Sequence, residues 1–216
     1  MSQLAVIGAT GFVGRNLVQK ALAAGHRVRA LARRPEALAE LAARIEVVRG
    51  DLFDPASLGQ LVQGADAVIS VAGPPFQGHH APEPYEKASS DLVAAARAAG
   101  ARRIITIAGA AARLPGEKLG VKRSLLRALL GRVVMPDIIR TKDREVAVIA
   151  SSDLDWTIIR PPRIGKGAPT GKVRATDQDL AGSTVDVEDL TDFILAQLQG
   201  REWVRRAPTI ASVPGS

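Results

Sequence analysis

Three glycines spaced three residues apart, Gly8, Gly11 and Gly14, have the type and spacing that bind a phosphate. An apolar stretch precedes them and a helical pattern follows. Gly8 lets the chain turn tightly, Gly11 lets a pyrophosphate approach the backbone, and Gly14 lets the helix pack closely on a strand. The helix N-terminus would then face the anion. The pattern predicts a dinucleotide-binding turn, and a tight turn without a ligand is the alternative.

Two arginines stand where the second strand is expected to end. Sites selective for NAD usually place Asp or Glu there, which accepts a hydrogen bond from the ribose 2′-hydroxyl. Arg33 and Arg34 would instead hold a 2′-phosphate, with Arg33 as the principal contact and Arg34 as its helper. The pair predicts NADP(H) in preference to NAD(H). Two ordinary surface arginines are the alternative.

Two further positions follow expected strands. Asp51 comes after the third strand, where it could meet an adenine amino group, although an N-cap role for Asp51 or Asp54 would explain it equally. Ala72 and Gly73 come after the fourth, and small residues there let a cofactor lie against the backbone. A simple turn would leave the same pattern.

The residues of common dehydrogenase chemistry are missing. The one tyrosine, Tyr85, is followed four residues later by Ser89, so no Tyr-x-x-x-Lys pair exists. The fifth strand ends in Ala108-Gly109 with no serine. The three histidines lack carboxylates at ligand spacing, and cysteine is absent, so we expect no metal site.

The elements that must position these residues alternate along the chain. Of its 216 residues, 46% are hydrophobic and 3% aromatic, which favours an aliphatic core. We predict an α/β fold, a Rossmann-type doubly wound parallel sheet flanked by helices, in a single domain over 1–216. The expected strands are 3–7, 27–32, 45–48, 65–71, 103–107 and 155–159, and the expected helices are 12–24, 35–43, 55–63, 83–99, 141–150 and 187–198.

No apolar run is long enough for a transmembrane helix, and the first strand begins too early to leave room for a signal peptide. With no cysteine in the chain, disulfides are excluded. These observations predict a cytoplasmic protein without membrane insertion.

Positive charge is concentrated in one segment. Between Arg102 and Arg144 there are eleven Lys and Arg against three Asp and Glu, an excess of eight, while the whole chain carries +7. Within it, we expect 111–136 to form a basic excursion with one amphipathic helix, a candidate flap over a site. The positive charge could attract nucleic acid, a membrane surface or an anionic small molecule, or it could belong to a solvated face without a partner. The lack of interleaved aromatics disfavours nucleic acid.

Several motifs in order carry a family resemblance: the glycine turn, Arg33-Arg34-Pro35, Gly50-Asp51-Leu52, Lys142-x-x-Glu145, and the run from Leu154 to Pro162. The chain resembles atypical short-chain dehydrogenase/reductase proteins with an NAD(P)H-binding domain. Within them it is most similar to the flavin reductase/biliverdin-IXβ reductase-like branch. The resemblance covers essentially the whole chain.

The resemblance implies a role for each matching position. Thr10, Gly11, Phe12 and Val13 would hold the pyrophosphate, Arg33 the 2′-phosphate, and Asp51 and Leu52 the adenine; Ala72, Gly73, Ala108 and Gly109 would line the nicotinamide side, and Pro162, Arg163 and Ile164 would approach its ribose and the acceptor. Reductases of this branch place a serine near the nicotinamide and histidines in the acceptor pocket. This sequence has Gly109 near the position of the serine, and Lys142 and Arg163 near the positions of the two histidines. The chain therefore departs from the pattern expected for biliverdin-type reduction.

The expected function is an NADPH-dependent reductase that transfers hydride to a flavin, quinone or similar conjugated acceptor, anionic or aromatic. Lys142 is the candidate to polarise the acceptor or donate a proton, and a helix-surface lysine beside Glu145 is the alternative. A non-catalytic NADP(H)-binding redox sensor or scaffold is the rival function, and a sugar-nucleotide epimerase is a third. We expect a monomer or a small homo-oligomer.

Overall fold

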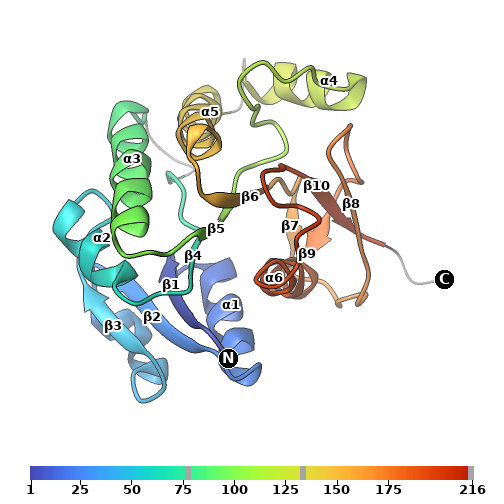
Figure 1. The fold of residues 1–216 in the computed structure, drawn as a ribbon. Helices are drawn as coiled ribbons and strands as arrows, with labels where there is room; N and C mark the ends of the chain where they lie inside the picture. The colour runs from blue at the N-terminus through green and yellow to red at the C-terminus, as the bar shows by residue number, and fades with distance from the viewer. Residues whose placement is uncertain (76–78, 132–134, 214–216) are drawn as a thin grey trace.

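The computed structural model describes residues 1–75, 79–131 and 135–213. Its centre is a six-stranded parallel sheet in the order β3-β2-β1-β4-β5-β6. The chain builds outward from β1 to one edge and then returns to add β4 on the other side (Figure 1). Ligands of doubly wound sheets bind at this reversal, beyond the carboxyl ends of the strands. The strands are β1 (Gln3–Ile7), β2 (Arg27–Ala32), β3 (Glu46–Arg49), β4 (Ala67–Ser70), β5 (Arg103–Ile107) and β6 (Asp155–Ile159).

Helices cover both faces of the sheet (Figure 1). On one face lie α1 (Phe12–Ala23), α6 (Val187–Ala196) and the 3₁₀ helix η1 (Pro35–Leu41); on the other lie α2 (Pro55–Val62), α3 (Glu83–Ala98) and α5 (Pro136–Ser151). Alternate residues of β1 enter the two cores, Leu4 and Val6 on the α1 side, Ala5 and Ile7 on the α2 side. Each fully buried Leu or Ile stabilises the fold by about 1.5–3 kcal/mol.

The predicted Rossmann-type sheet is confirmed, and 3–7, 27–32, 103–107 and 155–159 are strands with the predicted bounds. The predicted amphipathic helix of the excursion is α4 (Val121–Leu129). The helix predicted at 141–150 begins earlier, at Pro136, because proline is well placed in the first turn of a helix. The segment 35–43 forms a 3₁₀ helix with a kink at Leu38.

Four short strands after β6 were not predicted. β7 (Ile164–Gly165) pairs in parallel with β9 (Val185–Asp186), and β8 (Val173–Thr176) pairs antiparallel with β10 (Thr209–Ser212). Strands of two to four residues are too short to show an alternating pattern. They place the chain beyond β6 at the open edge of the sheet, next to the end where ligands are expected.

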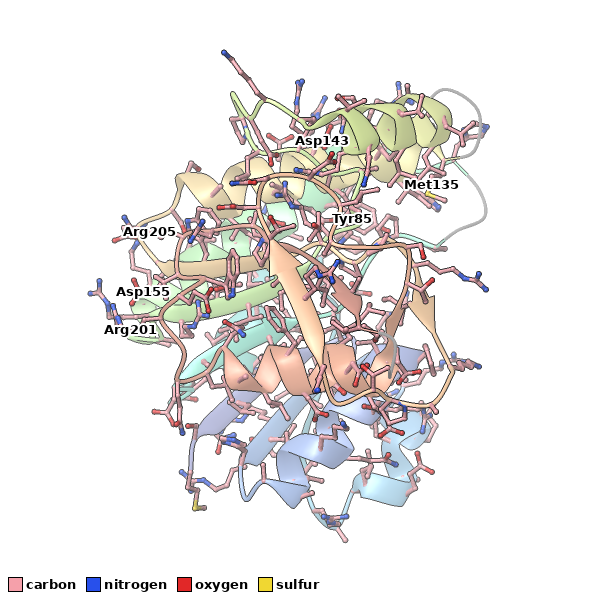
Figure 2. The ribbon with its side chains drawn as sticks, turned by 90° about the vertical axis from the view of Figure 1, so that its right-hand side faces the viewer. Tyr85, Met135, Asp143, Asp155, Arg201 and Arg205 are labelled. Atoms are coloured by element: carbon pink, nitrogen blue, oxygen red, sulfur yellow. The ribbon has the colours of Figure 1, made fainter. Side chains whose placement is uncertain are left out.

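The two ends of the sheet carry different residues. Figure 2 shows Asp155, Arg201 and Arg205 together at the edge where β6 begins, and Met135 far from them. Met135 belongs to the wall of the cleft described below. In the part of the chain that the structure describes, no helix is both long and apolar enough to cross a membrane.

Candidate functional site

The glycine turn has no space for side chains at two of its three glycines. Gly8 has φ of +88°, and a Cβ there would lie 2.8 Å from the amide nitrogen of Ala72. A Cβ at Gly14 would lie 2.0 Å from the carbonyl oxygen of Gly8. Gly11 is the N-cap of α1, whose first turn carries no acidic residue and no side-chain cap. The Gly11 amide donates to the Gly8 carbonyl at 3.0 Å, and the amides of the first turn of α1 could meet an anion. The turn therefore fits a pyrophosphate.

The predicted adenosine end lies beyond β2 and β3. Arg33 and Arg34 are exposed, as contacts to a 2′-phosphate must be. Asp54, and not Asp51, caps α2, since its oxygens accept from the amides of Ala56 and Ser57 at 3.1 and 3.2 Å. Asp51 accepts from the Phe53 amide at 3.0 Å in a local turn, so the N-cap alternative does not explain it.

Tyr85 connects this end with the middle of the site. Its ring meets Phe53 edge to face at 5.0 Å. Burial raises the pKa of its phenol, as does the negative charge of Glu145, while Arg33 acts in the opposite direction. Tyr85 therefore lies within electrostatic range of both the predicted phosphate contact and the partner of Lys142.

A cleft of about 590 Å³ opens at the carboxyl ends of β1, β4, β5 and β6. Its size is within the ordinary range of ligand sites. Of the predicted positions, the structure brings together Gly11, Phe12, Val13, Ala72, Gly73, Gly109, Lys142, Pro162, Arg163 and Ile164.

The remaining predicted positions lie elsewhere. Ala108 is buried in the core and does not line the cleft, because alternate residues at a strand end point to opposite faces. Leu52 packs against the same core and lines a small cavity of about 20 Å³ beside Tyr85. Gly8, Thr10, Arg33, Arg34 and Asp51 are outside the cleft lining, at the turn and the adenosine end.

For Lys142 the sequence left two alternatives, a group that acts on the acceptor and a helix-surface lysine beside Glu145, and the structure agrees with part of each. Its Nζ donates to the Ala72 carbonyl at 3.0 Å and to Glu145 Oε2 at 2.7 Å, so it does stand beside Glu145. It is not a solvated surface residue, because only 9% of it is exposed and it lines the cleft. α5 thus presents an ion-paired ammonium group at the end of β4.

The opposite wall of the cleft is apolar and comes mainly from the excursion and α5. Its residues are Ala111, Ala112, Leu130, Met135, Ile138 and Ile139. We did not predict these as site residues from the sequence, although the amphipathic helix and the candidate flap expected at 111–136 were the signal for them. The predicted excursion, 111–136, does line the site; three of its residues, 132–134, lie outside the described part of the chain.

Ion pairs fix this wall. Glu117 accepts from Arg123 at 2.7 Å and from Arg160 at 2.8 Å, and both arginines are almost fully buried. Burial and the nearby Arg123 charge lower the pKa of Arg160 to about 10. Arg127 donates to the Ala111 carbonyl at 2.7 Å and also pairs with Asp143. The loop that carries Ala111 and Ala112 is therefore held by side chains on both sides.

Comparison with known proteins agrees with this geometry. The family model described as NAD(P)H-binding matches residues 8–201, from the glycine turn to just beyond α6. The chain belongs to the NAD(P)H-binding family. The predicted resemblance to proteins with an NAD(P)H-binding domain is thereby confirmed.

Two curated relatives are reductases. The chain is 31% identical over 214 residues to a (4-alkanoyl-5-oxo-2,5-dihydrofuran-3-yl)methyl phosphate reductase of Streptomyces griseus, covering 95% of this chain and 66% of the relative. It is 40% identical over 117 residues to a ceramide reductase of Caulobacter vibrioides, covering 52% of this chain and 36% of the relative. The chain thus spans about two thirds of the first relative and about a third of the second.

A solved member of the same fold spans the whole chain. The structure titled as the anaerobillin reductase ChuY of Escherichia coli O157:H7 covers 100% of both chains with a TM-score of 0.79 and 21% identity. At that identity the likeness shows the fold. Together with the family match, it agrees with the Rossmann-type NAD(P)H-binding fold described above.

The sequence did not predict two side-chain contacts that the structure shows near the site. Lys166 lies over the ring of Phe12, with Nζ 4.7 Å from the centroid, and so adds a cation at the mouth of the turn. His79 Nδ1 lies 2.9 Å from Asp137 Oδ2, a contact the sequence gave no sign of. Among the described residues, no three His, Cys, Asp or Glu are grouped to hold a metal ion.

Proposed function

We propose that the protein is an NADPH-dependent reductase of small conjugated acceptors such as flavins or quinones. The observation that carries the proposal is the apolar cleft at the strand ends, with the single buried ammonium group of Lys142 among its described lining residues. The reductase names of the curated relatives support the reaction class. The first of these names a phosphate ester as substrate, which supports an anionic acceptor.

The chain's own residues bind and orient the reactants. The glycine turn would hold the pyrophosphate, Arg33 and Arg34 the 2′-phosphate, and Ala72, Gly73 and Gly109 would let the nicotinamide lie against the backbone. When bound, NADPH supplies the hydride. The preference for NADP(H) over NAD(H) rests on the two exposed arginines and the lack of an acid at that position.

The acceptor side of the cleft excludes water and supplies one proton. The wall of Leu130, Ile138 and Ile139 presents an apolar face to a flat conjugated ring. Lys142 would donate a proton from Nζ to the reduced acceptor, with Glu145 keeping the ammonium oriented. Arg163, exposed at the rim, would contact an anionic part of the acceptor or the cofactor.

The test is NADPH oxidation with flavin and quinone acceptors by the wild type and by Lys142→Met combined with Glu145→Gln, which leaves no buried unpaired charge. We expect kcat to fall about 100-fold while the affinity for NADPH is retained. The matched control is Lys87→Met with Asp91→Asn, an exposed ion pair on α3. An unchanged kcat would remove Lys142 from the mechanism.

A non-catalytic NADP(H) sensor or scaffold is the second candidate. It is favoured because Lys142 is already held by Ala72 and Glu145, and because the described lining of the cleft contains no Tyr, Ser or His. Tight NADPH binding by the wild type without turnover of any flavin, quinone or tetrapyrrole acceptor would decide for the sensor.

A further inference from the structure

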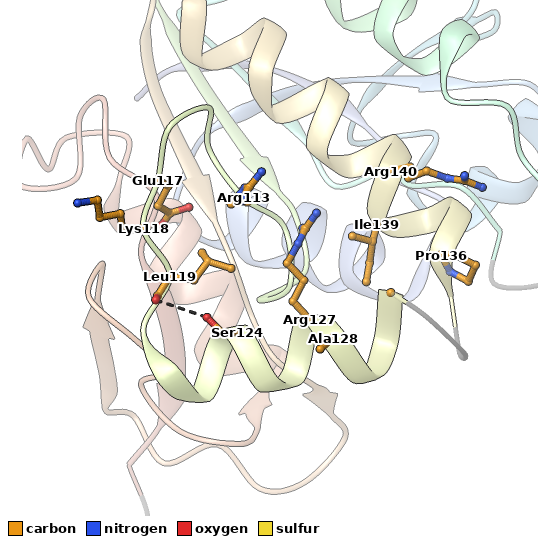
Figure 3. A pocket seen from close by; sticks show the side chains of 11 residues that line it. Arg113, Glu117, Lys118, Leu119, Ser124, Arg127, Ala128, Pro136, Ile139 and Arg140 are labelled. Atoms are coloured by element: carbon orange, nitrogen blue, oxygen red, sulfur yellow. Dashed lines mark hydrogen bonds between the residues drawn. The ribbon is translucent and has the colours of Figure 1, made fainter.

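A second cavity lies behind the apolar wall of the cleft (Figure 3). It measures about 730 Å³, is open to solvent and is lined by α4, the start of α5 and the loop 113–119. Ile139 lines both this cavity and the cleft. Ile139 is therefore common to both linings, and a ligand that extends past this side chain could occupy both spaces.

The lining of this cavity is cationic. It contains four basic side chains, Arg113, Lys118, Arg127 and Arg140, and one acid, Glu117. The carboxylate of Glu117 is already shared by Arg123 and Arg160, so it is engaged away from the other lining cations. Arg160 also has a buried Nε without a hydrogen-bond partner among the described residues. Such a wall attracts an anion.

Two of the four lining cations have no acidic partner in the described chain. Arg127 pairs with Asp143 and Arg140 pairs with Asp137, whereas no ion pair of Arg113 or Lys118 is found there. The backbone amide of Arg113 is fixed by Asp143 at 2.9 Å, which leaves its guanidinium available. Figure 3 shows Arg113 between Glu117 and Arg127, and Lys118 directed away from them. Arg113 is thus the best-placed open donor.

We propose that this cavity binds a phosphate or carboxylate group of the acceptor, whose conjugated part lies in the cleft on the other side of Ile139. The guanidinium of Arg127 bonds the carbonyl of Ala111, a cleft residue, so the cationic cavity is attached directly to the cleft wall. A guanidinium suits such a group because its planar donors match two oxygens at once. The inference rests on the proposed reductase function and assigns the part of the molecule that selects the acceptor.

FMN and riboflavin make a matched pair of probes, because they share the reducible ring and differ by one phosphate. Their affinities are measured by calorimetry on protein saturated with NADP⁺, which keeps the glycine turn from binding the probe phosphate. We expect FMN to bind at least 10-fold more tightly than riboflavin. Arg113→Ala abolishes this preference without weakening riboflavin, and Lys118→Ala reduces it less. Arg102→Ala, an exposed arginine at the opposite end of the sheet, leaves it unchanged.

Inorganic pyrophosphate, titrated into the same NADP⁺-saturated protein, separates an acceptor group from a free anion. Pyrophosphate binding as tight as that of FMN overturns the proposal, as does an equal affinity for FMN and riboflavin or an Arg113→Ala variant that keeps the preference. A lack of FMN binding overturns it too. If FMN is preferred through Arg113 but is not reduced by NADPH, the anion site stands and the reductase function fails.

Discussion

The turn that would hold the dinucleotide and the wall that would face the acceptor are built by different means. The turn depends on backbone: Gly8 and Gly14 leave no room for a Cβ, and main-chain amides at the start of α1 would face the ligand. The wall depends on side-chain ion pairs, with Glu117 tying two buried arginines to the loop beside Ala111. The comparison indicates that the turn cannot accept a side chain at Gly8 or Gly14, whereas the wall can change its shape and charge residue by residue.

Gly14→Ala should have the largest effect. The added methyl would collide with the Gly8 carbonyl and with Ala9 Cα at 2.7 Å, both of them backbone, so α1 must move. We expect a loss of at least about 3 kcal/mol in the free energy of unfolding, with loss of NADPH binding. Chemical denaturation and cofactor titration measure the two effects.

Gly59→Ala on α2 is the control for that substitution. A Cβ there meets nothing within 4 Å, so alanine should stabilise the helix by up to about 1 kcal/mol. If Gly14→Ala behaved like Gly59→Ala, the turn would not be the rigid backbone element described above.

Glu117→Gln tests the wall. Burial alone would raise the pKa of Glu117, but Arg123 and Arg160 hold it below its ordinary value of 4.5. Removing the carboxylate leaves two buried guanidinium groups without a counter-charge, and we expect a loss of about 2–3 kcal/mol. NADPH affinity should stay close to that of the wild type, unlike in the Gly14 variant.

The pH dependence of that loss follows from the lowered pKa. A carboxyl group whose pKa is lowered in the folded state stabilises the fold at pH values above its ordinary, unfolded-state pKa. This stabilisation disappears as the pH falls through the folded-state pKa. The free energies of unfolding of the wild type and of Glu117→Gln should therefore differ most at neutral pH and become similar at acidic pH. A difference that stays constant from pH 7 to pH 3 would show that Glu117 acts by packing alone.

Arg33→Ala should give the smallest of these effects and leave folding intact, since Arg33 is exposed. We expect the affinity for NADPH to fall about tenfold, near 1.4 kcal/mol, with NADH affected little. Arg34→Ala should show the same selectivity change more weakly. Equal losses for both cofactors, measured by fluorescence titration, would remove Arg33 as the 2′-phosphate contact.

The sequence was most informative where local pattern and fold coincide. The glycine turn, the βα alternation and the ends of β2, β5 and β6 follow from glycine spacing, apolar runs and helix stops, which act over a few residues. Most of the predicted cofactor positions accordingly meet at the strand ends. Ala108 lies in the core and outside the cleft lining, because the direction of a side chain at a strand end depends on register.

The acceptor wall could not be predicted in the same way. Glu117, Arg123 and Arg160 come from a loop, α4 and the end of β6, and no spacing rule brings them together. The short strands β7–β10 form only because β6 and α6 provide surfaces to pack on. The burial of Lys142 likewise depends on the distance between α5 and β4, which is a tertiary property.

Ile139, which lines both the cleft and the second cavity, also bears on how the acceptor site can change in evolution. Ile139 and Lys142 are three residues apart on α5, so they project from nearly the same side of one helical turn. A smaller residue at 139 would leave more room between the two spaces without touching the glycine turn or the ammonium group. The room for a longer acceptor can therefore change at this position while the cofactor turn stays the same.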